Sequence, residues 1–336
     1  MRVEALTDRG HDGSAGASSD RREQAQHRFR KIFDALNSDH GRQFPTWRPT
    51  AGALHPPQGQ WTNGSCPVNL GRARLPLRLL IVPGLGASLA GALGQPLPDA
   101  AAHVRRLGYA VDLLEVGGLT SSRRNARLLN HLIAGIEHDP AERIVVLGYS
   151  KGAVDALVAL ASHPALAERV TAMVSLAGSI GGSILVDDLP DAIFERGARL
   201  RRWLPLGGLK SLESRRRQRW LESAALPAQV RLYNLVSHAR RPRISGVLRA
   251  SYERLRWIDA RNDGQVLARH QVVPGSTLLA ELNADHWAVA LPLAQRHPWL
   301  RRVGLGANDY PREILLEAVL KHIEEDLLDP RTTGAP

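Results

Sequence analysis

Six short runs of apolar or β-branched residues recur along the chain from residue 77 onward, and most of them end at glycine, proline or a polar loop. The first five runs are almost continuously apolar, which is typical of strands buried on both faces of a parallel sheet. The pattern therefore predicts six strands. They are expected at 77–82, 110–116, 143–148, 170–176, 229–237 and 276–282.

Helical patterns fill the intervals between these runs. In the last of them Ile314, Leu315, Ala318 and Val319 recur at the spacing that places side chains on one helix face. Strands that alternate with helices predict an α/β fold with a doubly wound, mostly parallel sheet. The helices are expected at 98–107, 121–137, 152–162 and 311–328.

The parts outside this alternation define the predicted domain organisation. Residues 1–24 are polar and lack periodicity, so we expect disorder there, and 25–37 shows the spacing of a short helix. The stretch between the fourth and fifth strands is too long for a plain crossover. The predicted units are a disordered or weakly helical extension (1–40), an irregular lead-in (41–76), a core (77–180 and 228–330) and a helical, arginine-rich cap (181–227).

The net charge of +11 is concentrated in one segment. Residues 191–256 hold 16 of the 44 basic and 5 of the 33 acidic residues, so the remainder of the chain is balanced. A charge run of this kind is usually a solvated face. It could also meet an anionic membrane surface or an anionic substrate. Nucleic acid is the least favoured partner, because no nucleic-acid motif accompanies the charge.

Other global features exclude several classes. The single cysteine, Cys66, excludes an intramolecular disulfide and any zinc site built from several cysteines. The N-terminal stretch has acidic residues and no apolar run, unlike a secretory signal, and no stretch is apolar enough to span a bilayer. We therefore expect a cytoplasmic protein. The oligomeric state stays open.

The strongest chemical signal is the sequence Gly148-Tyr149-Ser150-Lys151-Gly152. It follows a predicted strand and precedes a predicted helix, which is the context that a G-x-S-x-G nucleophile turn requires. In that context the serine hydroxyl is exposed at the carboxyl edge of the sheet. The backbone N–H of Lys151 and the N-terminus of the helix would favour a developing oxyanion.

A serine nucleophile needs a base and a group that orients the base. His286 is the preferred base among the 13 histidines, because it follows the last predicted strand. His270, His297 and His322 are placed less favourably.

Asp263 is the preferred acid, because its Asp-Gly dipeptide predicts a turn from which a carboxylate can project. Asp259 is the first alternative, and Asp187 and Asp188 are weaker ones. Asp285, adjacent to the base, is interpreted as solvated.

These motifs, in this order, resemble those of the α/β-hydrolase superfamily, in particular its bacterial lipase and esterase branch. The resemblance covers roughly residues 77–328 and rests on four elements. They are Pro83-Gly84-Leu85-Gly86, the G-x-S-x-G, Asn262-Asp263-Gly264-Gln265-Val266 and Asp285-His286-Trp287. It implies a Ser150–His286–Asp263 triad and an oxyanion hole built from the N–H of Lys151 and a second N–H in the loop after the first strand. Many relatives have His-Gly in that loop where this chain has Pro83-Gly84, and by position Leu85 would supply the second donor.

The sequence therefore predicts a serine hydrolase that cleaves a small-molecule or lipid carboxylic ester without a metal or an organic cofactor. Tyr149 and Trp287 flank the nucleophile and the base, and they either line an acyl pocket or pack in the core. The same triad serves thioesterases, acyltransferases and amidases. A non-catalytic binding protein of the same fold is a further alternative, and so is a peripheral membrane or nucleic-acid binder.

Overall fold

The computed structural model describes residues 12–40, 52–57, 67–85, 95–137, 139–189, 207–302, 304 and 309–329. Cys66, Gly86 and a middle part of the predicted cap, residues 190–206, lie outside the described residues.

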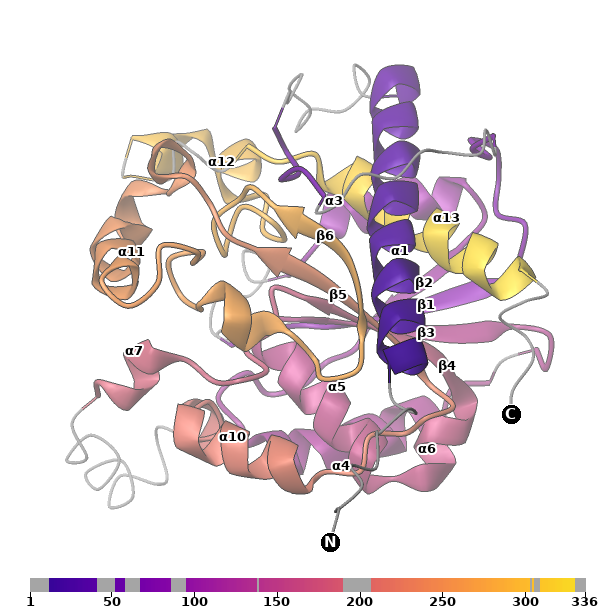
Figure 1. Cartoon of the computed structure of the whole chain (residues 1–336), viewed down its shortest axis with the longest axis horizontal. Coiled ribbons are helices and arrows are strands. Elements are labelled where there is room, and N and C mark those ends of the chain that lie inside the picture. The colour runs from indigo at the N-terminus through magenta and orange to yellow at the C-terminus, as the bar shows by residue number, and fades with distance from the viewer. Residues whose placement is uncertain are drawn as a thin grey trace, which may run out of the picture.

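Six parallel strands form one sheet at the centre of the described part of the chain (Figure 1). The strand order is β2-β1-β3-β4-β5-β6, and every neighbouring pair is parallel. Each strand coincides closely with one of the predicted apolar runs, so the predicted α/β class is confirmed. The strands are β1 Leu77–Val82, β2 Ala110–Leu113, β3 Arg143–Tyr149, β4 Val170–Leu176, β5 Arg231–Ser237 and β6 Thr277–Leu282.

Helices cover both faces of the sheet (Figure 1). One layer holds α4, α5 and α6, and the other holds α1, α3 and α13, so two separate hydrophobic clusters are buried, one on each side. This is the doubly wound arrangement that the alternation of patterns predicts. The helices are α1 Asp12–His40, α3 Pro98–Arg106, α4 Ser122–Ala134, α5 Lys151–Ser162, α6 Pro164–Arg169 and α13 Arg312–Leu328.

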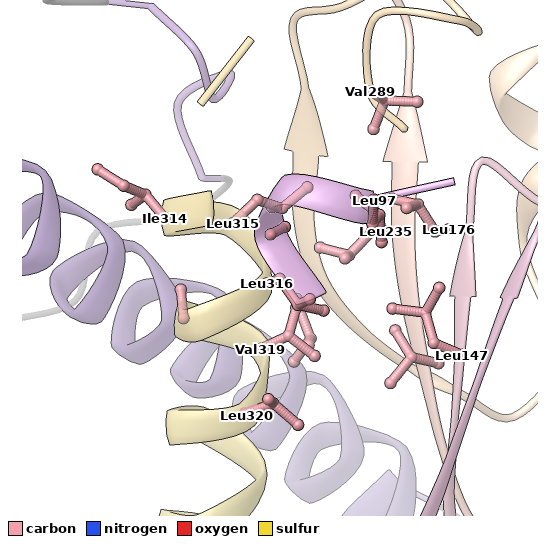
Figure 2. Close-up of a cluster of buried hydrophobic side chains, with 14 of the residues drawn as sticks. Leu97, Leu147, Leu176, Leu235, Val289, Ile314, Leu315, Leu316, Val319 and Leu320 are labelled. Carbon is pink, nitrogen blue, oxygen red and sulfur yellow. The ribbon is translucent and has the colours of Figure 1, made fainter. Parts of the chain in front are cut away.

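The apolar face of α13 packs towards the strands (Figure 2). Its Leu315, Leu316 and Leu320 lie in one cluster with Leu147, Leu176 and Leu235, which come from the adjacent strands β3, β4 and β5. Val289, in the loop after β6, belongs to the same cluster. The loop that carries His286 is therefore anchored in the core three residues further along the chain.

The N-terminal helix is longer than the sequence predicts. α1 begins at Asp12, whereas we expected disorder up to residue 24 and a helix over 25–37. Its buried side chains are the predicted ones, and Arg28 Nη2 forms a 2.6 Å ion pair with Glu325 of α13. Once tertiary contacts fix the later turns, each further residue needs only helix propagation, which costs far less than nucleation. The buried residues are Phe29, Ile32, Phe33 and Leu36.

A short piece of the predicted lead-in covers the exposed edge of β6. Residues 52–57 run beside this strand, where Leu54 bridges Leu282 in antiparallel fashion. The N–H of His55 donates to the carbonyl of Glu281 at 2.8 Å, and the N–H of Asn283 donates to that of Ala53 at 2.8 Å. Covering an edge strand removes unpaired backbone groups that would otherwise be open to other chains.

The described part of the predicted cap packs on the core through a buried arginine. Arg217 donates from Nε to the carbonyl of Ile180 at 2.8 Å, and its guanidinium lies 4.5 Å from the centre of the Trp220 ring. The sequence favours a solvated face for the charge run of residues 191–256, which contains Arg217. The structure corrects this for Arg217, because the helix turns it inward. Arg215, Arg216 and Arg219 are exposed. That this segment meets an anionic partner stays a prediction. The described cap helices are α7 Ile184–Asp187, α9 Gly207–Lys210 and α10 Ser214–Ser223.

A second excursion leaves the sheet between β5 and β6 and contains Asp263. Its segment before that residue packs through Ala239, Ile244, Leu248 and Tyr252 against Trp287.

Among the described residues, no helix combines the length and the apolar character that crossing a bilayer requires. The remaining elements are η3 Arg241–Arg243, η4 Gly246–Leu248, α11 Arg249–Arg256, η5 Ala268–Gln271, α12 Leu293–Arg296 and η6 Pro298–Arg301.

Candidate active site

Ser150 occupies a strained turn between β3 and α5. Its φ of 54° and ψ of −122° lie outside the regions that non-glycine residues usually adopt. The turn is possible only because the residues two positions before and after Ser150 are glycines without side chains. A Cβ atom on Gly148 would lie 2.4 Å from Cα of Ala153, and one on Gly152 would lie 2.2 Å from the carbonyl oxygen of Val82. The two glycines thus allow α5 to approach the ends of β1 and β3.

The loop after β1 passes directly beside the serine. A Cβ atom on Gly84 would lie 3.0 Å from Cβ of Ser150. Leu85, the next residue, is 39% exposed. The structure therefore places the two predicted oxyanion donors, the backbone amides of Leu85 and Lys151, in the segments that flank Ser150 on either side.

The structure joins Ser150, His286 and Asp263 in one chain of hydrogen bonds. Nδ1 of His286 lies 2.6 Å from Oδ2 of Asp263, and Nε2 of His286 lies 2.8 Å from Oγ of Ser150. Because an ionised carboxylate can only accept, Nδ1 carries the proton and donates a hydrogen bond to Asp263. Nε2 of the neutral ring is then free to accept the hydroxyl proton of Ser150. All three side chains are buried, and Ser150 is 7% exposed.

Asp263 is held rigidly by four hydrogen bonds. Its Oδ1 accepts from the N–H groups of Gln265 at 2.9 Å and Val266 at 2.7 Å. Its Oδ2 accepts from His286 and, at 3.2 Å, from Nε2 of Gln271. The N–H of His286 also donates to the carbonyl of Asp263 at 2.9 Å. Carboxylate and imidazole are therefore fixed relative to each other through both side chain and backbone.

Gln271 belongs to the hydrogen-bonded network of the candidate site, although it is not among the residues predicted from the sequence. Its side chain spans from Asp263 to β5, where it donates to the carbonyl of Ser237 at 2.7 Å and accepts from the N–H of the same residue at 2.7 Å. It belongs to no local motif and lies eight residues from Asp263, so nothing in the sequence marks it. Only the fold of the second excursion shows its role.

The alternative acids lie elsewhere. Asp259 is partly exposed and forms a 2.7 Å ion pair with Arg269. Asp187 accepts from the N–H of Ser214 at the start of α10, and Asp188 pairs with Arg254. None of the three has a hydrogen bond to His286.

Asp285 is buried, which corrects our expectation that it is solvated. Its side chain is fully enclosed and accepts backbone hydrogen bonds, because the chain turns inward immediately after β6. The side chain of Asp285 points into the protein interior rather than into water.

The two aromatic residues at the site have different surroundings. Tyr149 is buried, and its hydroxyl donates to the carbonyl oxygen of His286 at 2.7 Å. Burial raises the pKa of this hydroxyl well above its usual range, and the nearby carboxylates of Asp263 and Asp285 raise it further. It therefore stays protonated and can donate. Trp287 is half-buried and packs against the excursion after β5.

The side chain of Lys151 points away from the reacting atoms. It is buried beneath the turn, where Nζ contacts Oδ1 and Oδ2 of Asp155 at 2.9 and 2.7 Å. Asn125 of α4 donates to the same carboxylate at 2.7 Å. Burial lowers the pKa of Lys151, and the charge of Asp155 opposes that shift. The network joins α4 to the first turn of α5 and leaves only the backbone N–H of Lys151 for the site.

A hollow of about 420 Å³ lies beside the loop that carries His286, but outside this site. It is lined in part by Asn283 and by the arginine side chains of Arg30, Arg240 and Arg243. None of Ser150, His286 and Asp263 lines it. The three hydrogen-bonded residues therefore lie apart from this hollow.

Comparison with known proteins adds to this description. No family model and no curated protein matches the chain. Among solved structures, the metagenomic carboxyl esterase MGS0156 is 39% identical, with a TM-score of 0.82 over 89% of this chain and 91% of that one. The mature lipase BlEst2 of Bacillus licheniformis is 20% identical, with a TM-score of 0.51 over 66% of this chain and 89% of the lipase. The second match supports the fold alone.

The fold, the strained serine turn and the 39% identity over most of both chains define the class of the protein. The chain belongs to the α/β-hydrolase superfamily.

Proposed function

We propose that this protein is a serine hydrolase that cleaves carboxylic esters through Ser150, His286 and Asp263. The observation that carries the proposal is the continuous hydrogen-bonded path from Oγ of Ser150 through His286 to a buried carboxylate. A binding protein has no need of a base oriented in this way on a strained serine turn.

In the proposed reaction Oγ of Ser150 attacks the ester carbonyl carbon while Nε2 of His286 takes the hydroxyl proton. The negative charge that develops on the carbonyl oxygen is stabilised by the backbone N–H groups of Lys151 and Leu85 and by the N-terminus of α5. Asp263 holds the ring in the required tautomer and stabilises the imidazolium that forms.

The tetrahedral species then collapses. The bond to the leaving alcohol breaks, His286 returns its proton to that alcohol, and an ester of Ser150 with the acyl group remains. Water enters, gives a proton to Nε2 of His286 and attacks the acyl carbon. The bond between Oγ and the acyl carbon then breaks, His286 returns the proton to Oγ, and the carboxylic acid is released. Every proton transfer in this reaction passes through Nε2 of His286.

The ester is preferred over a thioester or an amide as substrate because the 39% identical relative is a carboxyl esterase. The same residues could act on all three bonds, since pocket shape and water access decide between them. A panel of acyl chains of increasing length, offered as oxygen esters, thioesters and amides, would define the preference.

The experiment that tests the proposal combines a mutation with covalent labelling. Ser150→Ala should abolish hydrolysis of short p-nitrophenyl esters and labelling by a fluorophosphonate probe, while the thermal melting temperature stays near the wild-type value. Most of the activity surviving in this variant, or a folded wild-type protein that the probe does not label, would refute the proposal.

A further inference from the structure

The carboxylate of Asp285, the residue before His286, is enclosed, and both of its oxygens accept hydrogen bonds. Asp285 is 0% exposed, and its Oδ1 accepts from the N–H groups of Trp287 at 3.0 Å and Ala288 at 2.7 Å. Its Oδ2 accepts from the N–H of Ser245 at 2.7 Å. Burial raises the pKa of Asp285, and the hydrogen bonds it accepts oppose that shift. A buried carboxylate that binds three backbone donors must serve the geometry of the chain around it.

The first arm of Asp285 fixes the turn on which His286 sits. Oδ1 satisfies the N–H groups two and three residues further on, as a capping side chain does at the start of a helix. The N–H of Val289 donates to the carbonyl of Asp285 and completes the turn. Val289 in turn lies in the hydrophobic core (Figure 2). The backbone on both sides of His286 is therefore held from within the protein.

The second arm ties this turn to the excursion after β5. Ser245 stands between Ile244 and Gly246, in the segment that packs against Trp287. The bond from its N–H to Oδ2 of Asp285 joins two stretches forty residues apart in the sequence. The stretch after Ser245 continues to Asp263, so the excursion that carries the acid is joined to the turn that carries the base.

A buried arginine extends the arrangement to the C-terminal helix. Arg312, the first residue of α13, is buried and donates from Nη1 to the carbonyl oxygen of Ala288. The same residue, Ala288, donates its N–H to Asp285. Burial lowers the pKa of Arg312 to about 10, and the charge of Asp285 is among those that oppose the shift. Ala288 thus lies between a buried carboxylate and a buried guanidinium.

We propose that Asp285 is a positioning residue that holds His286 in register with Ser150 and Asp263 through its bonds to Ala288 and Ser245. The proposal rests on the function proposed above. Asp285 has no contact with Ser150, and its effect on the reaction passes through the placement of the imidazole. A misplacement of about 1 Å can cost a hundredfold in rate, so the effect should appear in kcat.

Two substitutions of Asp285 separate the hydrogen bonds of its Oδ1 from the hydrogen bond of its Oδ2. An asparagine has one acceptor oxygen, so Asp285→Asn can keep the bonds to Trp287 and Ala288, but it then places an amide N–H against the N–H of Ser245. Asp285→Ala removes both arms. We expect kcat for a p-nitrophenyl ester to fall about tenfold in the asparagine variant and about a hundredfold in the alanine variant, with KM within about twofold of wild type.

A matched control is available in the same excursion. Asp259 also accepts a backbone N–H, from Arg261 at 2.9 Å, but it is partly exposed and does not contact His286. Asp259→Asn should therefore leave kcat unchanged. Fluorophosphonate labelling of Ser150, which also needs the base, should slow in both Asp285 variants in parallel with kcat.

A double-mutant cycle tests the bond to Ser245 directly. Ser245 has a φ of −55°, and Ile244 before it has a φ of −87° and a ψ of 122°, so the backbone accommodates proline at position 245. Ser245→Pro removes the N–H that Asp285 accepts. It should lower kcat in the wild-type background and add little in the Asp285→Ala background, where no acceptor remains and there is room for the ring.

Two results would overturn the proposal. One is a folded Asp285→Asn or Asp285→Ala protein with wild-type kcat and labelling rate. The other is an equal effect of Ser245→Pro in both backgrounds. If Asp285→Ala does not fold, the asparagine variant and Ser245→Pro decide by themselves. Failure of the proposed function would look different, because the wild-type protein would then neither hydrolyse esters nor react with the probe.

Discussion

The hydroxyl of Tyr149 donates a 2.7 Å hydrogen bond to the carbonyl oxygen of His286. Tyr149 precedes the nucleophile in the chain, and its ring lies 5.4 Å from the ring of His286. The bond therefore connects the serine turn to the loop of the base without using either reacting side chain.

Removal of this hydroxyl should weaken the site and the fold together. In Tyr149→Phe the buried carbonyl of His286 loses its donor, which costs about 1–3 kcal/mol in the free energy of unfolding. We expect a lower midpoint in urea denaturation and a reduced kcat. The matched control is Tyr252→Phe, in the excursion after β5, for which the urea midpoint and kcat should both stay near the wild-type values. Equal kcat in Tyr149→Phe and wild type would show that the bond does not hold His286.

The identity of the acid is tested by two amide substitutions. Asp263→Asn places an N–H where Nδ1 of His286 must donate, so the ring loses the tautomer it needs, and kcat should fall on the order of 10⁴-fold. Asp259→Asn should retain full activity, since that carboxylate pairs with Arg269 at the surface. An inactive Asp259→Asn beside an active Asp263→Asn would reverse the assignment.

The serine turn should not tolerate a methyl group at Gly152. A Cβ atom there would lie 2.2 Å from the carbonyl oxygen of Val82 and 2.5 Å from that of Pro83, and backbone atoms cannot rotate away. Overpacking of this kind costs about 1–3 kcal/mol or more. Gly152→Ala should lower the melting temperature and abolish activity. Gly135→Ala, where the nearest atoms would be 3.5 Å from the added Cβ or more, should leave both unchanged.

His322 should make the protein less stable in mild acid. Burial lowers its pKa below 6.5, and its ring packs edge-on against Phe29 and Tyr233. As the pH falls through about 6.5, the unfolded chain binds a proton that the folded protein does not bind, so the free energy of unfolding decreases. His55 and His270, whose pKa values burial also lowers, contribute with the same sign.

Replacement of His322 by leucine removes its share of this dependence. The fall in melting temperature between pH 7 and pH 5 should be smaller in His322→Leu than in wild type. Replacement of the exposed His131 by glutamine should leave the fall unchanged. An identical pH dependence in His322→Leu and wild type would contradict this assignment.

The sequence by itself determined the layered fold. Buried parallel strands need apolar side chains on both faces, and covering helices need one apolar face, so each element leaves a local pattern that can be found without any neighbour. For the same reason the serine turn could be predicted, since its glycines and its place between strand and helix are local. Chain order and loop position were enough to select His286 and Asp263 as candidates that the structure then joined.

The tertiary structure alone decided what supports these residues. Gln271, the hydroxyl of Tyr149 and Oδ2 of Asp285 act through partners that are 8 to 137 positions away in the sequence, and no local pattern records such a partner. Asp285 and Arg217 were misjudged because charged side chains are usually solvated, and only the packing of neighbouring segments shows which of them are enclosed. A local pattern can indicate which side chains must be buried for the fold to form. The orientation of a catalytic ring depends on hydrogen bonds between distant segments, and these exist only once the chain has folded.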